Sequence, residues 1–309
     1  MKKAAFLFLL IYINCTAQQN PIKPTGLVVT KAMVVSARAE ASKVGVEIMK
    51  KGGNAFDAMV GTELALAVAY PYAGNIGGGG FMVYRKANGE VGSLDYREKA
   101  PLAATKDMFL DKDGNVVKGK STETALAIGV PGTVAGVFAV HKKLGSLPMS
   151  EILKPVIALA EKGVIVTKKQ QKQLEAYHDA IVKVNGPNTL MAGKFQENDT
   201  IKYPALAETL KRILKNGKDE FYKGKTAKIL VDYLQKKGGI ITLKDLASYE
   251  AKWRTPLQFN YKELKITSMS PPSSGGICLA QIMKMIAPYD LSKMGHNSDQ
   301  SIQVIVEAE

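Results

Sequence analysis

The first clear pattern along the chain is a helical one. Apolar or small residues recur at i, i+3, i+4 and i+7, namely at Ala41, Val44, Gly45 and Ile48. This spacing is typical of an amphipathic helix that packs one face against a core. The pair Gly52-Gly53 follows directly, and because glycine is a poor helix former we expect the helix to end there.

A second helix is predicted to run from Asn54 to Tyr70. Asparagine is a favourable N-cap, and Pro71 cannot continue a helix. The segment between them, AFDAMVGTELALAVAY, is apolar on nearly every side, so we expect it to be buried on most of its surface. Asp57 and Glu63 lie inside this segment, and carboxylates in such a place need polar partners.

The rest of the chain alternates helices with short strands. Helical spacing predicts helices over 131–143, 149–162, 169–184, 205–216, 219–237, 276–287 and 297–309. Short apolar runs predict strands over 33–35, 255–261 and 263–268. The mixture predicts an α/β (α+β) fold whose sheets are mainly antiparallel.

Residues 81–97 are predicted to form a β-hairpin. Asn88-Gly89 at its centre is the dipeptide most typical of a two-residue type I′ turn. If these two residues form the loop, the strands pair in one definite register, with apolar side chains together on one face. The expected pairs are Phe81 with Tyr96, Val83 with Leu94, and Gly80 with Arg97.

Four consecutive glycines, Gly77 to Gly80, precede this hairpin. Glycine loses much conformational entropy on folding and adds no side chain to a core, so the run needs a specific explanation. Opposite Arg97, the glycines would leave open space beside the guanidinium, a rigid fork of donors that suits a carboxylate or phosphate. Alternatively, the glycines form a tight bend and Arg97 pairs with Asp95 or Glu98. The residues by themselves leave both interpretations open.

The chain is basic, with a formal net charge of +14 from 42 Lys and Arg against 28 Asp and Glu. A basic surface can attract nucleic acid, an anionic envelope or small acidic ligands. The lysines, however, are scattered singly and in pairs, without the basic stripe and interleaved aromatic residues that favour nucleic-acid binding. We therefore expect a solvated basic surface and no nucleic-acid partner.

Residues 1–17 have the pattern of a signal peptide. Lys2 and Lys3 form a short positive region, an apolar run follows, and Cys15-Thr16-Ala17 offers small residues for cleavage. The run is too short for a transmembrane helix, which needs about 20 residues. We expect a periplasmic or secreted protein whose mature chain, 18–309, is a single domain; lipid attachment through Cys15 is the alternative.

The other residues with reactive side chains have structural explanations. After removal of the signal peptide, Cys278 is the only cysteine, so the mature chain has no internal disulfide. Ser273 and Ser274 lie between a double proline and a diglycine, which indicates a loop entering a helix with a serine N-cap. The histidines lack metal-ligand spacing, so we expect neither a metal nor a cofactor. They are His141, His178 and His296.

Five motifs occur in the order KKGGNAFDAMV, NIGGGGFMVYR, LDYREKAP, GVPGTVAG and SMSPPSSGG. From about Thr30 to the last residue, this order resembles the γ-glutamyltranspeptidase (glutathione hydrolase) family. The resemblance implies an N-terminal-nucleophile hydrolase with a four-layer αββα sandwich, built from two subunits that autocatalytic cleavage cuts from one zymogen. It also implies transfer of the γ-glutamyl group of glutathione and related amides to water or to an amino-acid acceptor.

The resemblance assigns a role to one residue of the hairpin. In the family, the arginine of the D-[FY]-R-E motif binds the α-carboxylate of the γ-glutamyl group. Arg97 occupies that position here. The resemblance thus favours ligand binding over the purely structural interpretation of Arg97.

The family's nucleophile has no counterpart in this sequence. It is a threonine that becomes the N-terminus of the small subunit, where its own α-amine activates its hydroxyl. It lies in a Thr-Thr-His-type stretch, and this sequence has no Thr-Thr pair followed by His. We therefore expect most of a large subunit, without a catalytic residue of its own and inactive in isolation. Two alternatives are a cephalosporin-acylase-like enzyme on the same fold and a degenerate, non-catalytic binding protein.

Overall fold

A computed structural model of the chain describes residues 26–309. The predicted signal peptide, residues 1–17, and Cys15 within it lie outside the described residues. Every helix and strand of the described residues lies in one unit, Val34–Glu309. Residues 33–35 form no strand, so that prediction is wrong: a short apolar run becomes a strand only where it finds a partner.

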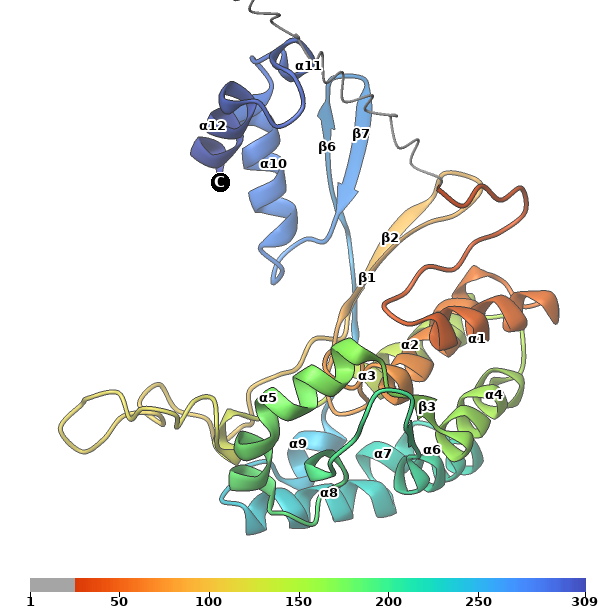
Figure 1. The fold of residues 1–309 in the computed structure, drawn as a ribbon, viewed down its shortest axis with the longest axis vertical. Helices are drawn as coiled ribbons and strands as arrows, with labels where there is room; N and C mark the ends of the chain where they lie inside the picture. Colours follow the sequence, from red (N-terminus) through yellow and green to blue (C-terminus); the bar gives the residue numbers. More distant parts are fainter. Residues whose placement is uncertain (1–25) are drawn as a thin grey trace, which may run out of the picture. The chain divides into compact units, whose positions relative to one another are not determined.

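The helices of the described residues follow the predicted order closely (Figure 1). They are α1 (Ala39–Lys50), α2 (Ala55–Ala69), α3 (Thr133–Leu144), α4 (Met149–Lys162), α5 (Lys168–Asn185), α6 (Pro204–Asn216), α7 (Asp219–Tyr222), α8 (Lys225–Lys236), α9 (Leu243–Ala247), α10 (Gly275–Ile286), α11 (Leu291–Met294) and α12 (Asp299–Ala308). The short helices α9 and α11 are too brief to have produced a recognisable period in the sequence.

The strands are short and pair only antiparallel, as predicted. They are β1 (Phe81–Arg85), β2 (Val91–Asp95), β3 (Val164–Ile165), β4 (Thr200–Ile201), β5 (Lys252–Arg254), β6 (Leu257–Tyr261) and β7 (Leu264–Ser268). One sheet has the order β1-β2-β5, and β3 with β4 and β6 with β7 form two further pairs. Strand β5 was not predicted. It lies more than 150 residues after the hairpin in the chain and pairs with β2.

Helix α2 forms the centre of the main core. It packs against α1, α3 and α4, which explains why its sequence is apolar on nearly every side. The Asn54 side chain caps it by accepting the N–H groups of Phe56 and Asp57. Asp57, fully buried, accepts hydrogen bonds from the Asn54 N–H and from the Ser146 and Leu147 segment after α3. The predicted need of Asp57 for partners is therefore met by a loop about 90 residues away.

The helix predicted over 219–237 is in fact two helices, α7 and α8. The break lies at Gly224, where a Cβ atom would come within 2.6 Å of the Glu220 side chain and 2.8 Å of its backbone. The Glu220 carboxylate accepts the N–H and hydroxyl of Thr226 at the start of α8 and pairs with Arg212. A buried carboxylate thus caps the second helix, an arrangement that hydrophobic spacing does not record.

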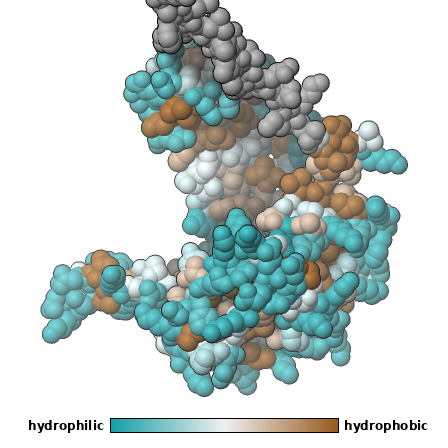
Figure 2. Space-filling view, in the orientation of Figure 1, coloured by the Kyte–Doolittle hydropathy of each residue, from teal (hydrophilic) through white to brown (hydrophobic). Residues whose placement is uncertain are grey.

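The C-terminal segment packs mainly on itself. Helix α10 contacts α12 and the β6-β7 pair. Apolar side chains on α10 and α12 nevertheless remain exposed, and Figure 2 shows hydrophobic surface over this part of the chain. They include Ile277, Met285, Ile302, Ile305 and Val306, with exposed fractions between 38% and 62%. Within residues 26–309, none of the helices combines the length and the apolar character that crossing a membrane requires.

Candidate functional site

The predicted hairpin forms, but its register differs by one residue from the prediction. The loop has three residues rather than two, because Lys86 and Glu90 close it through a 2.8 Å backbone hydrogen bond. Gly89 has φ +88°, the left-handed conformation that a type I turn followed by a bulge requires. The Asn-Gly dipeptide therefore identified the turn correctly and its length wrongly.

This shift moves the side chains to the opposite faces. Met82 pairs with Leu94, and Gly80 exchanges two backbone hydrogen bonds with Tyr96, of 3.2 and 3.0 Å. Met82, Leu94 and Tyr96 form the buried face, while Val83 is 39% exposed. The predicted pairs of Phe81 with Tyr96, Val83 with Leu94 and Gly80 with Arg97 are wrong.

The glycine run packs closely against neighbouring segments and does not leave open space beside an arginine. A Cβ atom on Gly80 would lie 2.9 Å from the Tyr96 ring, and one on Gly79 would lie 2.7 Å from the backbone nitrogen of Glu98. The Gly78 carbonyl accepts the N–H groups of Gly132 and Thr133, at 2.7 and 3.0 Å, where α3 begins. The run therefore lets the hairpin pack against the start of α3 more closely than residues with side chains would allow.

Arg97 follows β2 and is exposed, with its guanidinium carbon 6.0 Å from the centre of the Phe81 ring. It forms no ion pair with any residue of the described part of the chain. The structural partner considered for it, Asp95, is bound instead by Arg254, whose Nε and Nη2 lie 2.9 and 2.7 Å from Asp95 Oδ2. Within residues 26–309, Arg97 thus presents a surface guanidinium without an ion-pair partner.

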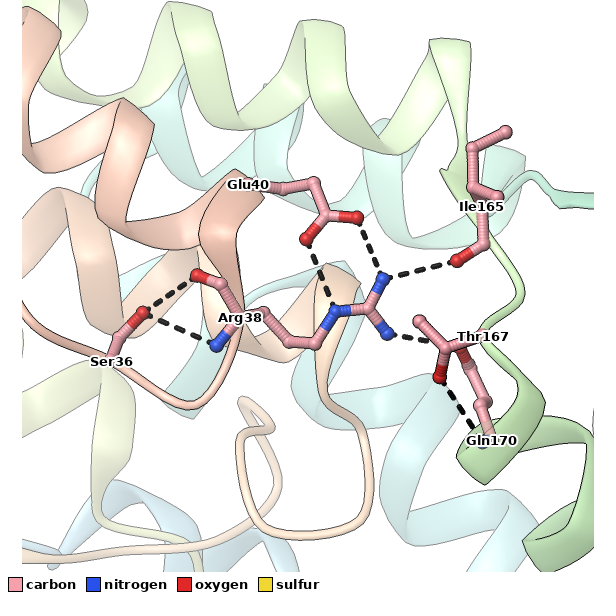
Figure 3. A network of polar contacts seen from close by, with 6 residues as sticks. All are labelled: Ser36, Arg38, Glu40, Ile165, Thr167 and Gln170. Atoms are coloured by element: carbon pink, nitrogen blue, oxygen red, sulfur yellow. Dashed lines mark hydrogen bonds and ion pairs between the residues drawn. The ribbon is translucent and has the colours of Figure 1, made fainter. Parts of the chain in front are cut away.

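Arg38 differs from Arg97 because its guanidinium is bound by other residues of the chain (Figure 3). Arg38 donates to both carboxylate oxygens of Glu40, at 2.6 and 3.1 Å, and to the side chain of Gln170 and the carbonyl of Ile165, each at 3.0 Å. These contacts tie the start of α1 to the segment around α5. All three guanidinium nitrogens of Arg38 are occupied, whereas the Arg97 guanidinium has no hydrogen-bond acceptor among the residues that the structure describes.

A pocket of about 320 Å³ adjoins the glycine run. Its lining includes Gly78, Gly79, Asn75 and the carboxylates of Glu63 and Glu98. Burial raises the pKa of Glu63, although the 2.9 Å hydrogen bond from the Tyr96 hydroxyl acts to lower it. The sequence signalled Glu63 only as a carboxylate inside an apolar helix that needed a partner; it gave no indication of this pocket.

The other candidate residues make contacts with residues near them in the sequence. Ser274 is the residue before α10, but the cap contact comes from Ser273, whose hydroxyl accepts the Gly275 N–H at 3.2 Å. His141 bonds the Leu147 carbonyl, and His178 bonds Asp179. Among residues 26–309, no group of three or more His, Cys, Asp or Glu side chains is arranged to hold a metal ion.

Comparison with known proteins gives consistent results. The family model described as gamma-glutamyltranspeptidase matches residues 41–309. The glutathione hydrolase proenzyme of Escherichia coli K12 is 42% identical over 283 residues, which cover 90% of this chain and 49% of that protein. The crystal structure of Helicobacter pylori gamma-glutamyltranspeptidase matches with a TM-score of 0.88 at 44% identity, covering 92% of this chain and 82% of that one. The Acylase ACY 1 proenzyme of Pseudomonas sp. SE83 is 32% identical over 288 residues.

The chain spans about half the length of the curated relatives it matches. Within that half, the likeness to solved γ-glutamyltranspeptidases confirms the predicted fold class, that of the N-terminal-nucleophile hydrolases. Family model, sequence identity and fold agree over nearly all of the described residues. The chain belongs to the γ-glutamyltranspeptidase family.

Proposed function

We propose that this chain is the large-subunit part of a γ-glutamyltransferase, or glutathione hydrolase, in which Arg97 binds the α-carboxylate of the γ-glutamyl group. The observation that carries the proposal is the state of Arg97: it occupies the arginine position of the family's D-[FY]-R-E motif, and its guanidinium is exposed and unpaired within the described residues. A free guanidinium can bind a carboxylate through two parallel hydrogen bonds. Because Arg254 neutralises Asp95, no adjacent carboxylate competes for Arg97 from that side.

The reaction requires a nucleophile that the described residues do not supply. We assign it to a threonine at the start of a second subunit, released when the zymogen cleaves itself. Its hydroxyl would attack the γ-glutamyl amide and form an acyl-enzyme, which water or an amino-acid acceptor then resolves. Arg97 would hold the far end of the glutamyl group and so set the distance between its carbonyl and that hydroxyl.

Two observations support a second subunit as partner. The relatives named proenzymes are about twice as long as the matched segment, whereas the same segment fills 82% of the solved Helicobacter pylori chain. The exposed apolar face of α10 and α12 is also the kind of surface that a stable partner covers. We propose that the downstream half covers this face.

We further propose that residues 1–17 are a signal peptide and that residues 18–309 belong to an exported, periplasmic or secreted enzyme. The positive residues Lys2 and Lys3, the apolar run and the small residues before Gln18 support this proposal. Determination of the N-terminal residue of the mature protein tests it: Gln18 is expected. A lipid-modified Cys15 would instead indicate the anchored alternative.

The function is tested in the enzyme that contains the downstream half. The gene beyond codon 309 should continue in frame to a Thr-Thr-His-like stretch; a stop codon there would favour the non-catalytic alternative. With γ-glutamyl-p-nitroanilide as donor, Arg97→Ala should raise KM about 10- to 100-fold, as loss of a bidentate charged contact implies. Arg85→Ala is the matched control, because Arg85 is an exposed arginine of the same hairpin and also has no ion pair within residues 26–309. An unchanged KM in Arg97→Ala would refute the assignment.

A second candidate, an acylase for glutaryl-type amides, is favoured by the 32% identity to an acylase proenzyme. Both donor groups carry a terminal carboxylate that Arg97 could hold, but only the γ-glutamyl group carries an α-amine. Comparison of kcat/KM for γ-glutamyl and glutaryl p-nitroanilides separates them. Preference for the glutaryl donor would identify the acylase.

A further inference from the structure

We propose that Tyr249, Asp95 and Arg254 are positioning residues that fix the backbone of Arg97 from two sides and thereby set where its guanidinium meets the substrate carboxylate. This inference rests on the proposed function of Arg97. Asp95 belongs to the motif around Arg97, whereas Tyr249 and Arg254 come from a segment about 150 residues later that the motif does not include.

The first contact is made by Asp95. Its carboxylate is nearly buried, and its two oxygens have different partners. Oδ2 receives both Nε and Nη2 of Arg254, while Oδ1 accepts the backbone N–H of Arg97 at 3.1 Å. Because Arg254 ends β5, which pairs with β2, the ion pair reinforces the strand pairing directly below Arg97. The Arg97 nitrogen is therefore attached to a carboxylate that cannot rotate freely.

The second contact is made by Tyr249. Its hydroxyl donates a 2.8 Å hydrogen bond to the Arg97 carbonyl, and only 3% of the residue is exposed. Its ring stacks on the Tyr222 ring, with centres 5.8 Å apart and planes 11° apart. Tyr222 in turn accepts the N–H of Ala135 and donates to the carbonyl of Pro131, each at 3.0 Å, around the start of α3. Tyr249 is therefore held in place by a rigid helix end.

The Tyr249 phenol stays in the donor form. Burial raises its pKa, and the carboxylates of Asp95 and Glu98 raise it further. The hydrogen bond to the Arg97 carbonyl is thus present throughout the physiological pH range.

Both backbone groups of Arg97 are occupied, while its side chain has no ion pair within residues 26–309. No ion pair within residues 26–309 orients the side chain. The two backbone contacts therefore define the position of the Cα atom from which the side chain extends. Bidentate recognition tolerates only small errors in the position of the fork. Loosening either backbone contact should weaken carboxylate binding without removing the guanidinium.

The test uses two donors that differ in one group, in the enzyme that contains the downstream half. γ-Glutamyl-p-nitroanilide carries the α-carboxylate, and 4-aminobutyryl-p-nitroanilide lacks only that carboxylate. The ratio of their kcat/KM values measures the preference for the carboxylate. Tyr249→Phe keeps the stacked ring and removes one hydrogen bond, so we expect this preference to fall about three- to tenfold, chiefly through KM of the γ-glutamyl donor.

Tyr203→Phe is the matched control, because Tyr203 is also buried and its hydroxyl has no partner among the described residues. The ratio should not change in this variant. Arg254→Lys gives a second reading: it keeps the charge beside Asp95 but loses the two-donor contact, and it should lower the ratio in the same direction.

The outcomes separate this inference from the proposed function. If Arg97→Ala abolishes the preference while Tyr249→Phe and Arg254→Lys leave it intact, the positioning role is wrong and the function of Arg97 stands. Equal losses with both donors in Tyr249→Phe would indicate general structural damage and would also overturn the inference. If Arg97→Ala leaves the ratio unchanged, both proposals fail.

Discussion

The phenol of Tyr96 donates a 2.9 Å hydrogen bond to the carboxylate of Glu63 and so joins the arginine-containing motif to the central helix α2. Tyr96 is 2% exposed, and its ring lies against Gly80. The contact connects a partly buried acid, the glycine run and the residue next to Arg97. Its strength should depend on the protonation state of Glu63.

Glu63 should make stability depend on pH in a particular direction. Burial raises its pKa above the ordinary value of 4.5, so the folded state holds the proton more tightly than the unfolded state. The associated stability is complete below about pH 4.5 and is lost as the pH rises through the folded pKa. Glu63→Gln cannot titrate, so urea unfolding of wild type and variant across pH 4 to 8 should show that part of the decline in wild type alone. Parallel curves would contradict the prediction.

The glycine run should tolerate side chains very unequally. A methyl group at Gly80 would lie 2.9 Å from the Tyr96 ring, and overpacking of this kind costs about 1–3 kcal/mol. At Gly77 the nearest atom is 3.7 Å away, so Gly77→Ala should be close to neutral. Denaturant midpoints of Gly80→Ala and Gly77→Ala give a direct comparison within four residues. Equal effects would show that the run serves flexibility rather than close packing.

Asp57 should stabilise the chain in the opposite pH range to Glu63. Burial acts to raise its pKa, but the hydrogen bonds from Ser146, Asn54 and Leu147 outweigh burial and hold the pKa below 3.8. Its contribution is therefore present above about pH 3.8 and is lost as the pH falls through the folded pKa. At pH 7, Asp57→Ala should lower the free energy of unfolding by about 2–4 kcal/mol, since several donors lose a buried acceptor. Acid unfolding of Asp57→Asn should begin from a lower stability and show a shallower dependence on pH.

The apolar face of α10 and α12 should bind the downstream half. Ile302→Ser and Val306→Ser remove exposed apolar side chains from this face, so they should weaken copurification of the two halves while leaving the helical circular dichroism of this chain intact. Ile229→Ser on α8 is the control, because Ile229 is 52% exposed but lies on another helix. Equal losses in all three variants would refute a specific interface.

Local sequence predicted the helices well because helix ends depend on nearby residues. The prediction for 149–162 coincides with α4, and Asn54 caps α2 as expected. The split of 219–237 escaped prediction because it depends on Glu220, whose buried carboxylate binds a residue six positions on, outside the hydrophobic pattern. Where a side-chain contact rather than hydrophobic periodicity sets a helix boundary, the periodicity predicts the wrong helix length.

The surroundings of Arg97 were predicted only in part, for a similar reason. Arg97 was identified from its motif, but the register that orients the hairpin depends on one extra loop residue at Gly89. Asp95, the structural partner considered for Arg97, is paired instead with Arg254, which lies 159 positions away. No short window of sequence contains that pair, so the sequence could name Arg97 as a candidate but could not show that Asp95 has another partner.

Because β5 pairs with β2 at the edge of the sheet, the hairpin and its partner strand must form in a definite order during synthesis. While a ribosome has released only the hairpin segment, Asp95 lacks Arg254, and Asp95 and Glu98 are both available to pair with Arg97. Asp95 gains its partner Arg254 only after residue 254 emerges and β5 pairs with β2, a long-range step that is slow compared with hairpin closure. The Asp95–Arg254 contact therefore forms only after the chain has grown 159 residues beyond Asp95.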